Sequence, residues 1–253
     1  MIIKDKKEHD TLKEAGRRLA FVLDEVAEKI APGVTEKELD AEARRLIEKG
    51  GDTPAFLGYT PRGAEKPYPA TLCVSVNDAV VHGIPTDRPF REGDVVALDI
   101  GLVHDGIVVD MAKTYLVGVV SDKIKKLVSV TEESLTAGIA ASRAGGRIGD
   151  IGHAISSVVE GAGFEVVYEL GGHGVGNKVH EGPFIPNYGK KGRGEKLVLG
   201  MVLALEPIVA AGEPDIVLAD DGYTYKTKDG SIAAHFEHTI LITEKGAEIV
   251  TRK

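Results

Sequence analysis

The two halves of the chain repeat one order of residue patterns, and this repeat constrains the fold more than any other feature of the sequence. At one constant offset, the matched positions are Gly33, Leu39, Ala43, Ile47, Glu48 and Gly51, then Gly145, Ile151, Ile155, Val159, Glu160 and Gly163. Two amphipathic segments could agree by chance, but here polar residues recur in register with apolar ones. Two copies are too few for a solenoid. We therefore predict a single domain over residues 1–253, with related halves at about 8–118 and 122–245.

Each half is predicted to begin with two helices, because apolar residues recur there at helical spacing. Thr35 and Glu38 form a capping-box pattern at the start of the second helix. The predicted helices cover about 8–30, 35–50, 122–143 and a last segment ending near 161. The predicted strands cover 73–81, 95–103, 107–117, 165–170, 201–210 and 232–243. The expected class is α+β, with helix–helix–strands repeated in pseudo-two-fold symmetry, a curved antiparallel sheet around a central site and helices outside.

The composition excludes several classes of protein. The single cysteine, Cys73, leaves no intramolecular disulfide and no multi-cysteine zinc site. With 39 acidic against 31 basic residues, the net charge of -8 disfavours a general nucleic-acid binder. No secretory signal is visible, and no apolar run approaches the roughly 18 residues of a membrane span. We expect a cytoplasmic protein without a membrane contact.

Two aspartates interrupt neighbouring apolar strands. Asp99 and Asp110 each lie in a run of apolar residues, where a charge is costly unless it is paired or bound to a metal. Asp105–Gly106 between the runs predicts a tight hairpin turn. That turn places Asp110 opposite Gly101, on the same sheet face as Asp99, so both carboxylates can reach one metal pair. The alternative is two solvated aspartates on the open face of a hairpin.

The second half supplies two further carboxylates and a histidine. Glu206, the counterpart of Asp99 in the repeat, and Glu237 also interrupt apolar strands. Four converging carboxylates would repel one another, and a metal pair relieves this repulsion. His173 lies between glycines and is the natural nitrogen ligand, although it could equally be a loop histidine bonded to the backbone. Oxygen ligands with an imidazole suit Mn, Fe, Co or Zn.

These residues in this order closely resemble the methionine aminopeptidases, which belong to the pita-bread metallopeptidases. The matching segments are residues 75–85, Asp99–Gly101 with Asp110, Gly172–Gly176 with His180–Glu181, Leu205–Pro207, and Phe236–Thr239. The short stretch from His180 to Glu206 leaves no room for the insertion of the type II enzymes. The resemblance therefore implies a single catalytic domain with the pita-bread fold, of the minimal type I kind.

The resemblance also implies a role for each metal-ligating residue. Asp110 and Glu237 would bridge two divalent ions, Asp99 would hold one ion, and His173 and Glu206 would hold the other. A water between two cations loses its proton near neutral pH and becomes the nucleophile. Glu206 is expected to act as both ligand and general acid/base.

Two further histidines and a pocket follow from the same resemblance. His82 would lie near the amino end of the substrate and His180 would bind the carbonyl oxygen, although either histidine alone could be structural. Position-matching nominates Cys73, Tyr68, Tyr59 and Tyr223 for binding the methionine side chain, with simple packing left open for Cys73. Three departures from the family pattern suggest a wider or reshaped pocket: Val179 replaces a bulky aromatic residue, Tyr223 replaces a tryptophan, and the Tyr59–Tyr68 loop is longer than usual.

The implied substrate is the N-terminal initiator methionine of nascent polypeptides whose second residue is small. The family also implies a monomer. The basic loop with Lys190, Lys191, Arg193 and Lys196 could contact ribosomal RNA or simply be solvated. One rival function is cleavage next to proline, but those relatives carry a large N-terminal domain for which this sequence shows no room. The other rival is a binding module without chemistry, which would be expected to lack some of the five ligands.

Overall fold

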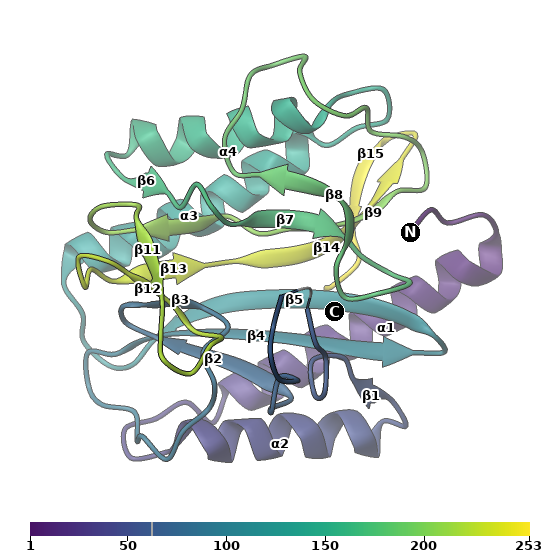
Figure 1. The fold of residues 1–253 in the computed structure, drawn as a ribbon. Helices are drawn as coiled ribbons and strands as arrows, with labels where there is room; N and C mark the ends of the chain where they lie inside the picture. The colour runs from purple at the N-terminus through teal and green to yellow at the C-terminus, as the bar shows by residue number, and fades with distance from the viewer. Residues whose placement is uncertain (62) are drawn as a thin grey trace.

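The computed structural model describes residues 1–61 and 63–253, and four helices form its outer layer (Figure 1). The helices are α1 (Lys6–Ala27), α2 (Glu36–Lys49), α3 (Asp122–Ala141) and α4 (Ile148–Gly161). In Figure 1, α1 and α2 lie below the strands, whereas α3 and α4 lie above them. Each predicted helix is therefore present, with its bounds shifted by a few residues.

The two helix pairs begin their second helices in the same way. The Thr35 side chain accepts the Glu38 N–H, and the Glu38 carboxylate accepts the Thr35 N–H at 2.7 Å, which confirms the capping box. At the matching positions of the second half, Asp150 accepts the Arg147 N–H at 2.8 Å. These bonds satisfy amides that have no partner within the helix.

Matched glycines have matched backbone conformations. The φ angles are 93° at Gly33 and 84° at Gly145, and 80° and 83° at Gly51 and Gly163. These angles lie in the left-handed region, which glycine enters without the steric cost of a Cβ. The repeated sequence positions thus carry the same local geometry in both halves.

A nine-stranded antiparallel sheet fills the space between the helix pairs. Its order is β1-β4-β5-β14-β9-β7-β8, with β2 paired to β4 and β15 paired to β14. Its strands are β1 (Thr53–Pro54), β2 (Leu72–Val76), β4 (Val95–His104), β5 (Ile107–Leu116), β7 (Gly171–Gly174), β8 (Glu181–Pro186), β9 (Val202–Leu205), β14 (Glu237–Thr243) and β15 (Gly246–Ile249). The curled sheet and the outer helices confirm the predicted α+β class.

Two three-stranded sheets adjoin the main one. The first has the order β13-β10-β6 and the second β11-β12-β3. Their strands are β3 (Ala79–Val81), β6 (Glu165–Val166), β10 (Ile208–Ala210), β11 (Ile216–Leu218), β12 (Tyr225–Thr227) and β13 (Ala233–His235). Both sheets continue predicted strands that leave the main sheet.

Three predicted strands are broken, which corrects the sequence analysis. The segment 73–81 divides at Asn77, which has a φ of 58°. The segment 201–210 divides at Glu206 and Pro207, and 232–243 divides at Phe236. Pro207 has no N–H to donate to a strand ladder, which explains the second break. The breaks were not predicted because a continuous run of apolar residues does not reveal where the chain passes from one sheet to another. Only Glu165–Val166 of the predicted strand 165–170 is a strand.

The glycines around His173 allow strands to approach closely, and His173 lies in strand β7, not in the loop of the alternative interpretation. A Cβ on Gly172 would lie 2.3 Å from the Ala204 carbonyl oxygen, and one on Gly174 would lie 2.3 Å from that of Gly182. β7 can therefore fit between β8 and β9 only because these positions lack side chains.

Alternation along the strands separates an apolar face from a polar one. Leu98 and Ile100 of β4 are fully buried in a core shared with Leu19 and Leu23 of α1. Asp99 between them points to the opposite face, because successive strand residues face opposite sides. Burial of the apolar face against helices thus turns the carboxylates inward. Within residues 1–61 and 63–253, helices that combine the length and apolar character for crossing a membrane are absent.

Candidate metal centre

Five neighbouring strands of the main sheet each bring one of the predicted ligands to its concave face. The order β4-β5-β14-β9-β7 corresponds to Asp99, Asp110, Glu237, Glu206 at the end of β9, and His173. Both halves of the chain contribute, so the centre forms only when the halves pack together. The structure therefore brings all five predicted ligands to one place.

The hairpin between β4 and β5 has the predicted register. Gly101 is opposite Asp110, and Asp99 is opposite Ala112. The two aspartates are therefore diagonal neighbours on one face. A further pair of bonds holds Asp110 in place: its N–H donates to Thr239 Oγ1 at 2.9 Å, and the Thr239 hydroxyl donates to the Asp110 carbonyl at 2.8 Å.

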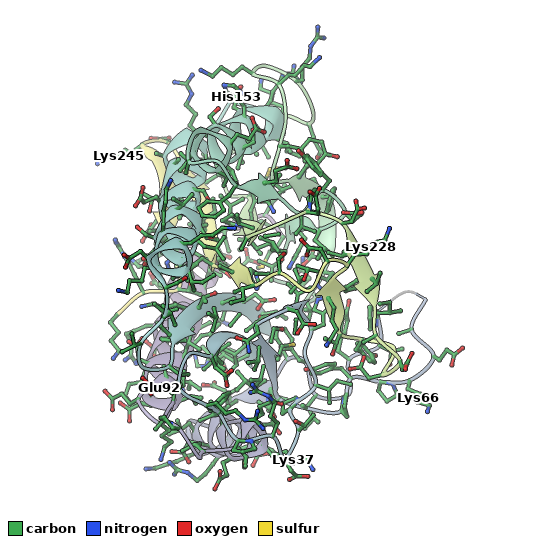
Figure 2. The ribbon with its side chains drawn as sticks, turned by 90° about the vertical axis from the view of Figure 1, so that its left-hand side faces the viewer. Lys37, Lys66, Glu92, His153, Lys228 and Lys245 are labelled. Atoms are coloured by element: carbon green, nitrogen blue, oxygen red, sulfur yellow. The ribbon has the colours of Figure 1, made fainter. Side chains whose placement is uncertain are left out.

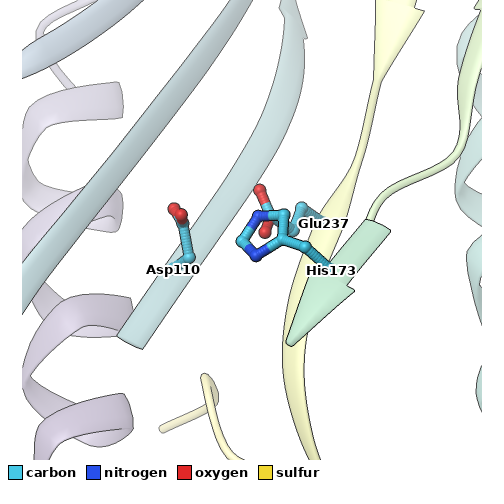
Figure 3. Close-up of side chains that lie close together, drawn as sticks. All are labelled: Asp110, His173 and Glu237. Atoms are coloured by element: carbon cyan, nitrogen blue, oxygen red, sulfur yellow. The ribbon is translucent and has the colours of Figure 1, made fainter. Parts of the chain in front are cut away.

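Asp110, His173 and Glu237 form a compact group of candidate metal ligands. One ligand atom from each side chain lies within 4.8 Å of the other two, and all three residues are buried. Figure 3 shows them reaching into the same space from separate strands. His173 Nδ1 lies 2.9 Å from the Gly174 carbonyl, which accepts a hydrogen bond when Nδ1 carries the proton. His173 Nε2 is then a free acceptor directed at the carboxylates.

Glu206 lies against His173 on the other side of this cluster. Its Oε1 is 3.4 Å from His173 Nε2. Its backbone carbonyl accepts a hydrogen bond from the Asn187 side-chain amide at 2.9 Å. Just after β9, the Glu206 backbone carbonyl is thus bonded to a side chain and not to a neighbouring strand.

Burial makes the ionised forms of these carboxyl groups costly. Burial raises the pKa of Asp99 from 3.8 to about 7. Burial, followed by repulsion from Asp99, raises the pKa of Asp110 and Glu206 well above their usual values. Glu237 is raised in the same way, by burial and then by the charge of Asp110. Removal from water and mutual repulsion act together here.

The donor set fits divalent cations. Asp99 Oδ1 and Glu237 Oε1 are buried without a hydrogen-bond partner. Unpaired buried carboxylate oxygens are expensive, and a cation would satisfy them. Carboxylates with one imidazole suit borderline divalent ions rather than soft metals. The protein thus has a centre for divalent metal in which all five predicted ligands can take part.

An apolar cavity of about 540 Å³ opens onto this centre. Every residue predicted for the site lines it: Asp99, Asp110, His173, Glu206, Glu237, His82, His180, Cys73, Tyr68, Tyr59 and Tyr223. Phe56 and Pro61 line it too, and sequence reasoning missed both. Val179 instead packs in the apolar core. Residue 62 of the long Tyr59–Tyr68 loop lies outside the described residues.

The two non-ligand histidines, His82 and His180, both line the cavity. Tyr59 Oη is 2.9 Å from His180 Nδ1, and the His180 ring lies 4.5 Å from that of His173 between centroids. His82 has a φ of 58°, a left-handed conformation that is uncommon for residues other than glycine. Burial lowers the pKa of His82 to about 4 and also lowers that of His180. Both rings are therefore neutral at neutral pH.

His235 is a residue of this centre that the sequence analysis did not single out. Its Nε2 is buried without a hydrogen-bond partner and lies 3.6 Å from Glu206 Oε2. The available signal was its position two residues before Glu237 in an apolar run.

The chain matches known metallopeptidases over nearly its full length. The pattern of metallopeptidase family M24 matches residues 10–244. Methionine aminopeptidase 1 of Bacillus subtilis is 46% identical, with 100% of this chain and 99% of the relative covered. The methionine aminopeptidase of Aquifex aeolicus is 45% identical, with coverages of 97% and 96%.

Solved structures agree with the sequence comparison. The crystal structure of methionine aminopeptidase from Thermotoga maritima has a TM-score of 0.95 at 45% identity, with 100% of both chains covered. The prolidase from Pyrococcus horikoshii has a TM-score of 0.77 at 24% identity, and this chain covers 64% of it. The second likeness shows a shared fold alone. The predicted pita-bread fold is thereby confirmed.

The raised pKa of Asp99 predicts a pH-dependent stability of the metal-free protein. The folded protein holds this proton more tightly than the unfolded chain, so its contribution is present below about pH 4 and is lost as the pH rises through about 7. In the Asp99→Asn variant the side chain is neutral at every pH, so this contribution to the free energy of unfolding does not change with pH. The difference in unfolding free energy between variant and wild type should therefore grow in favour of the variant over this range.

Urea unfolding in the presence of a chelator measures this difference. Asp105→Asn is the matched control, since Asp105 is an exposed aspartate at the turn between the same two strands. A difference for Asp99→Asn that stays constant with pH would contradict the prediction.

Proposed function

This chain belongs to metallopeptidase family M24 and, within it, to the methionine aminopeptidases, and we propose that it acts on polypeptides whose second residue is small. It is a metallo-aminopeptidase that removes N-terminal methionine. The observation that carries the proposal is the position of the five-residue centre on a cavity with a mainly apolar lining. Nascent polypeptides are the proposed substrates, and a cytoplasmic location stays a prediction.

We propose that two divalent ions occupy the centre, drawn from Mn, Fe, Co or Zn. Asp110 and Glu237 would bridge them, because these side chains lie centrally in the sheet order and within reach of one another. Asp99 would hold one ion, and His173 with Glu206 the other, in keeping with their 3.4 Å approach. When bound, the ions would acidify a water and polarise the scissile carbonyl.

In this proposal, Glu206 moves the proton that the reaction needs. Its Oε1 lies beside His173 and its Oε2 beside His235, and Oε2 has two lone pairs, so it can still accept a proton from water and pass it to the leaving amine. The bond from Asn187 to the Glu206 backbone keeps the carboxylate at the centre. One side chain can thus act as both ligand and general acid/base.

His180 is proposed to bind the carbonyl oxygen of the scissile bond. If the Tyr59 hydroxyl donates to Nδ1, the neutral ring carries its proton on Nε2 and can donate from there. A donor directed at the developing oxyanion stabilises the transition state more than the ground state. His82 is proposed to lie near the amino end of the substrate.

The methionine side chain is proposed to bind among Cys73, Tyr68, Tyr223 and Phe56. Burial raises the pKa of the Cys73 thiol, so it stays neutral and behaves as a small apolar group. The Tyr68 hydroxyl donates to the Gly83 carbonyl at 2.9 Å, and its ring packs edge-on against Tyr223 at 5.2 Å. Aromatic rings beside a thiol provide the polarisable surroundings that a thioether favours.

The chain is expected to release free methionine from Met-Gly-Met-Met once a suitable divalent ion is restored to metal-stripped protein. Glu206→Ala should abolish turnover and weaken metal binding, because it removes a ligand together with the proton carrier. Glu244→Ala, which removes an exposed carboxylate from the turn after the same strand as Glu237, is the matched control.

The same assay includes peptides with a large second residue, which test the preference at that position, and Xaa-Pro peptides, which test cleavage next to proline. Folded wild-type protein that releases no methionine with Mn, Fe, Co or Zn would contradict the activity. Equal rates on Met-Ala and Met-Leu peptides would contradict the preference for a small second residue.

His180→Ala should lower kcat by about a hundredfold to a thousandfold, the usual effect of losing one oxyanion donor. KM and metal content should change little, because His180 is not a proposed ligand. Steady-state kinetics and metal analysis on the same preparations measure both effects. A variant with wild-type kcat and KM would disprove the oxyanion role.

A basic loop between β8 and β9 is proposed to contact ribosomal RNA. Lys190, Lys191, Arg193 and Lys196 are exposed, and the loop is held by the Gly192 N–H, which donates to Asp150 Oδ1 at 2.7 Å. A fixed cluster of cations can neutralise phosphates at little further cost in ordering. The chain is proposed to act there as a monomer.

Replacing Lys190, Lys191 and Arg193 with alanine should weaken co-sedimentation with ribosomes, and the loss should be largest at low salt. The matched control replaces Lys4, Lys6 and Lys7, which are exposed near the start of α1. Equal binding by both triple variants, or binding that does not respond to salt, would exclude this contact.

A further inference from the structure

The backbone around His235 is held rigidly at the edge of the metal centre. His235 ends β13, pairs with Ile208 of β10 and is only 2% exposed. Its N–H donates to Thr114 Oγ1 at 2.9 Å, and the Thr114 hydroxyl donates to the His235 carbonyl at 2.7 Å. A backbone fixed in this way leaves the ring few positions other than the one observed.

The ring is directed at two of the centre's carboxylates. Nε2 lies 3.6 Å from Glu206 Oε2 and 3.9 Å from Glu237 Oε2, and it has no hydrogen-bond partner. Both distances are slightly long for a hydrogen bond. A buried ring nitrogen without a partner is costly, so a small movement that closes one of these gaps is favourable.

The two oxygens of Glu206 face two different histidines. Oε1 faces His173 Nε2 at 3.4 Å, and Oε2 faces His235 Nε2 at 3.6 Å. The contact from His173 Nδ1 to the Gly174 carbonyl leaves the other His173 nitrogen as an acceptor suited to a metal. The Nε2 atom of His235 faces carboxylate oxygens, which can only accept hydrogen bonds when ionised. A proton on Nε2 therefore gives both the ring nitrogen and the facing carboxylate oxygen a hydrogen-bond partner.

We propose that His235 is a positioning residue that donates from Nε2 to Glu206 Oε2 and so directs Oε1 toward the metal shared with His173. A hydrogen bond to a ligating carboxylate fixes its orientation, and loss of such a bond typically costs about tenfold to a hundredfold in activity or metal affinity. This role rests on the proposed metal centre and on the proposed work of Glu206.

His235→Leu removes the donor, and His235→Gln keeps an N–H donor on a side chain of similar reach. We expect His235→Leu to lower kcat on Met-Gly-Met-Met about tenfold to a hundredfold, with KM nearly unchanged. The number of Co(II) ions bound, measured by calorimetry, should stay the same. The visible spectrum of bound Co(II) should change, because the ligand geometry of Glu206 is altered. His235→Gln should recover most of the wild-type kcat and spectrum.

His238→Gln is the matched control, since His238 lies on β14, the next strand along the chain, and its Nδ1 is 2.9 Å from Thr251 Oγ1 instead of facing the carboxylates. His235→Ala, which adds no new bulk, replaces the leucine variant if that protein does not fold. Circular dichroism and urea unfolding establish that the variants compared are folded.

Three results would overturn the proposal: wild-type kcat and spectrum in His235→Leu, a loss of one bound Co(II) ion, or equal damage in the leucine and glutamine variants. The second result would make His235 a ligand, and the third would assign it a packing role. If wild-type protein released no methionine, the proposed function would fail, and the Co(II) spectra would still decide the role of His235.

Discussion

Repulsion among buried carboxylates is the constraint on which the rest of the structure depends. Asp99, Asp110, Glu206 and Glu237 meet on the concave face of one sheet, largely removed from water. Without cations, burial and mutual repulsion raise the pKa of each of these carboxyl groups and so favour the protonated forms. Such a cluster persists only if the surrounding fold is stable enough to hold it, and two helix pairs packed on the outer face supply that stability. Divalent cations bound among these carboxylates would offset the repulsion.

The curled main sheet brings together residues that lie far apart in the chain. Each half of the repeat supplies a helix pair and strands, and the main sheet joins the halves where β5 pairs with β14. The proposed ligands come from both sides of this junction, so neither half brings all five together alone. At Glu206 the chain leaves the main sheet for a smaller one, and at Phe236 it passes from that smaller sheet back into the main one. In Figure 2 the helices lie toward the left of the view, and Lys66 and Lys228 lie toward the right, on the side away from them.

The sequence predicted those parts of the site that depend on local geometry. The tight turn at Asp105–Gly106 fixes the register of two strands, so the diagonal placement of Asp99 and Asp110 followed from spacing alone. The helix pairs were predictable for the same reason, because the spacing of apolar residues along a helix is also a local pattern. Contacts between segments far apart in the chain were not predictable in this way. The bond between Tyr59 and His180 and the approach of His235 to Glu206 depend on how the strands curl, which residue order does not specify. Resemblance to a family supplied roles for matched positions, but it could not show that Val179 packs in the core instead of lining the cavity.

The loop from Tyr59 to Tyr68 connects the wall of the pocket to His180 beside the metal centre. Tyr59 and Tyr68 are joined at the base of their loop, since the Tyr68 N–H donates to the Tyr59 carbonyl at 2.8 Å. From that base Tyr59 reaches His180, while Tyr68 packs against Tyr223, whose hydroxyl donates to the Lys66 carbonyl in the same loop. A change in the loop is therefore transmitted both to the apolar wall of the pocket and to the proposed donor at the scissile bond. Because the two sides share this base, the residues proposed to bind the methionine side chain are connected to the residue proposed to bind the scissile carbonyl.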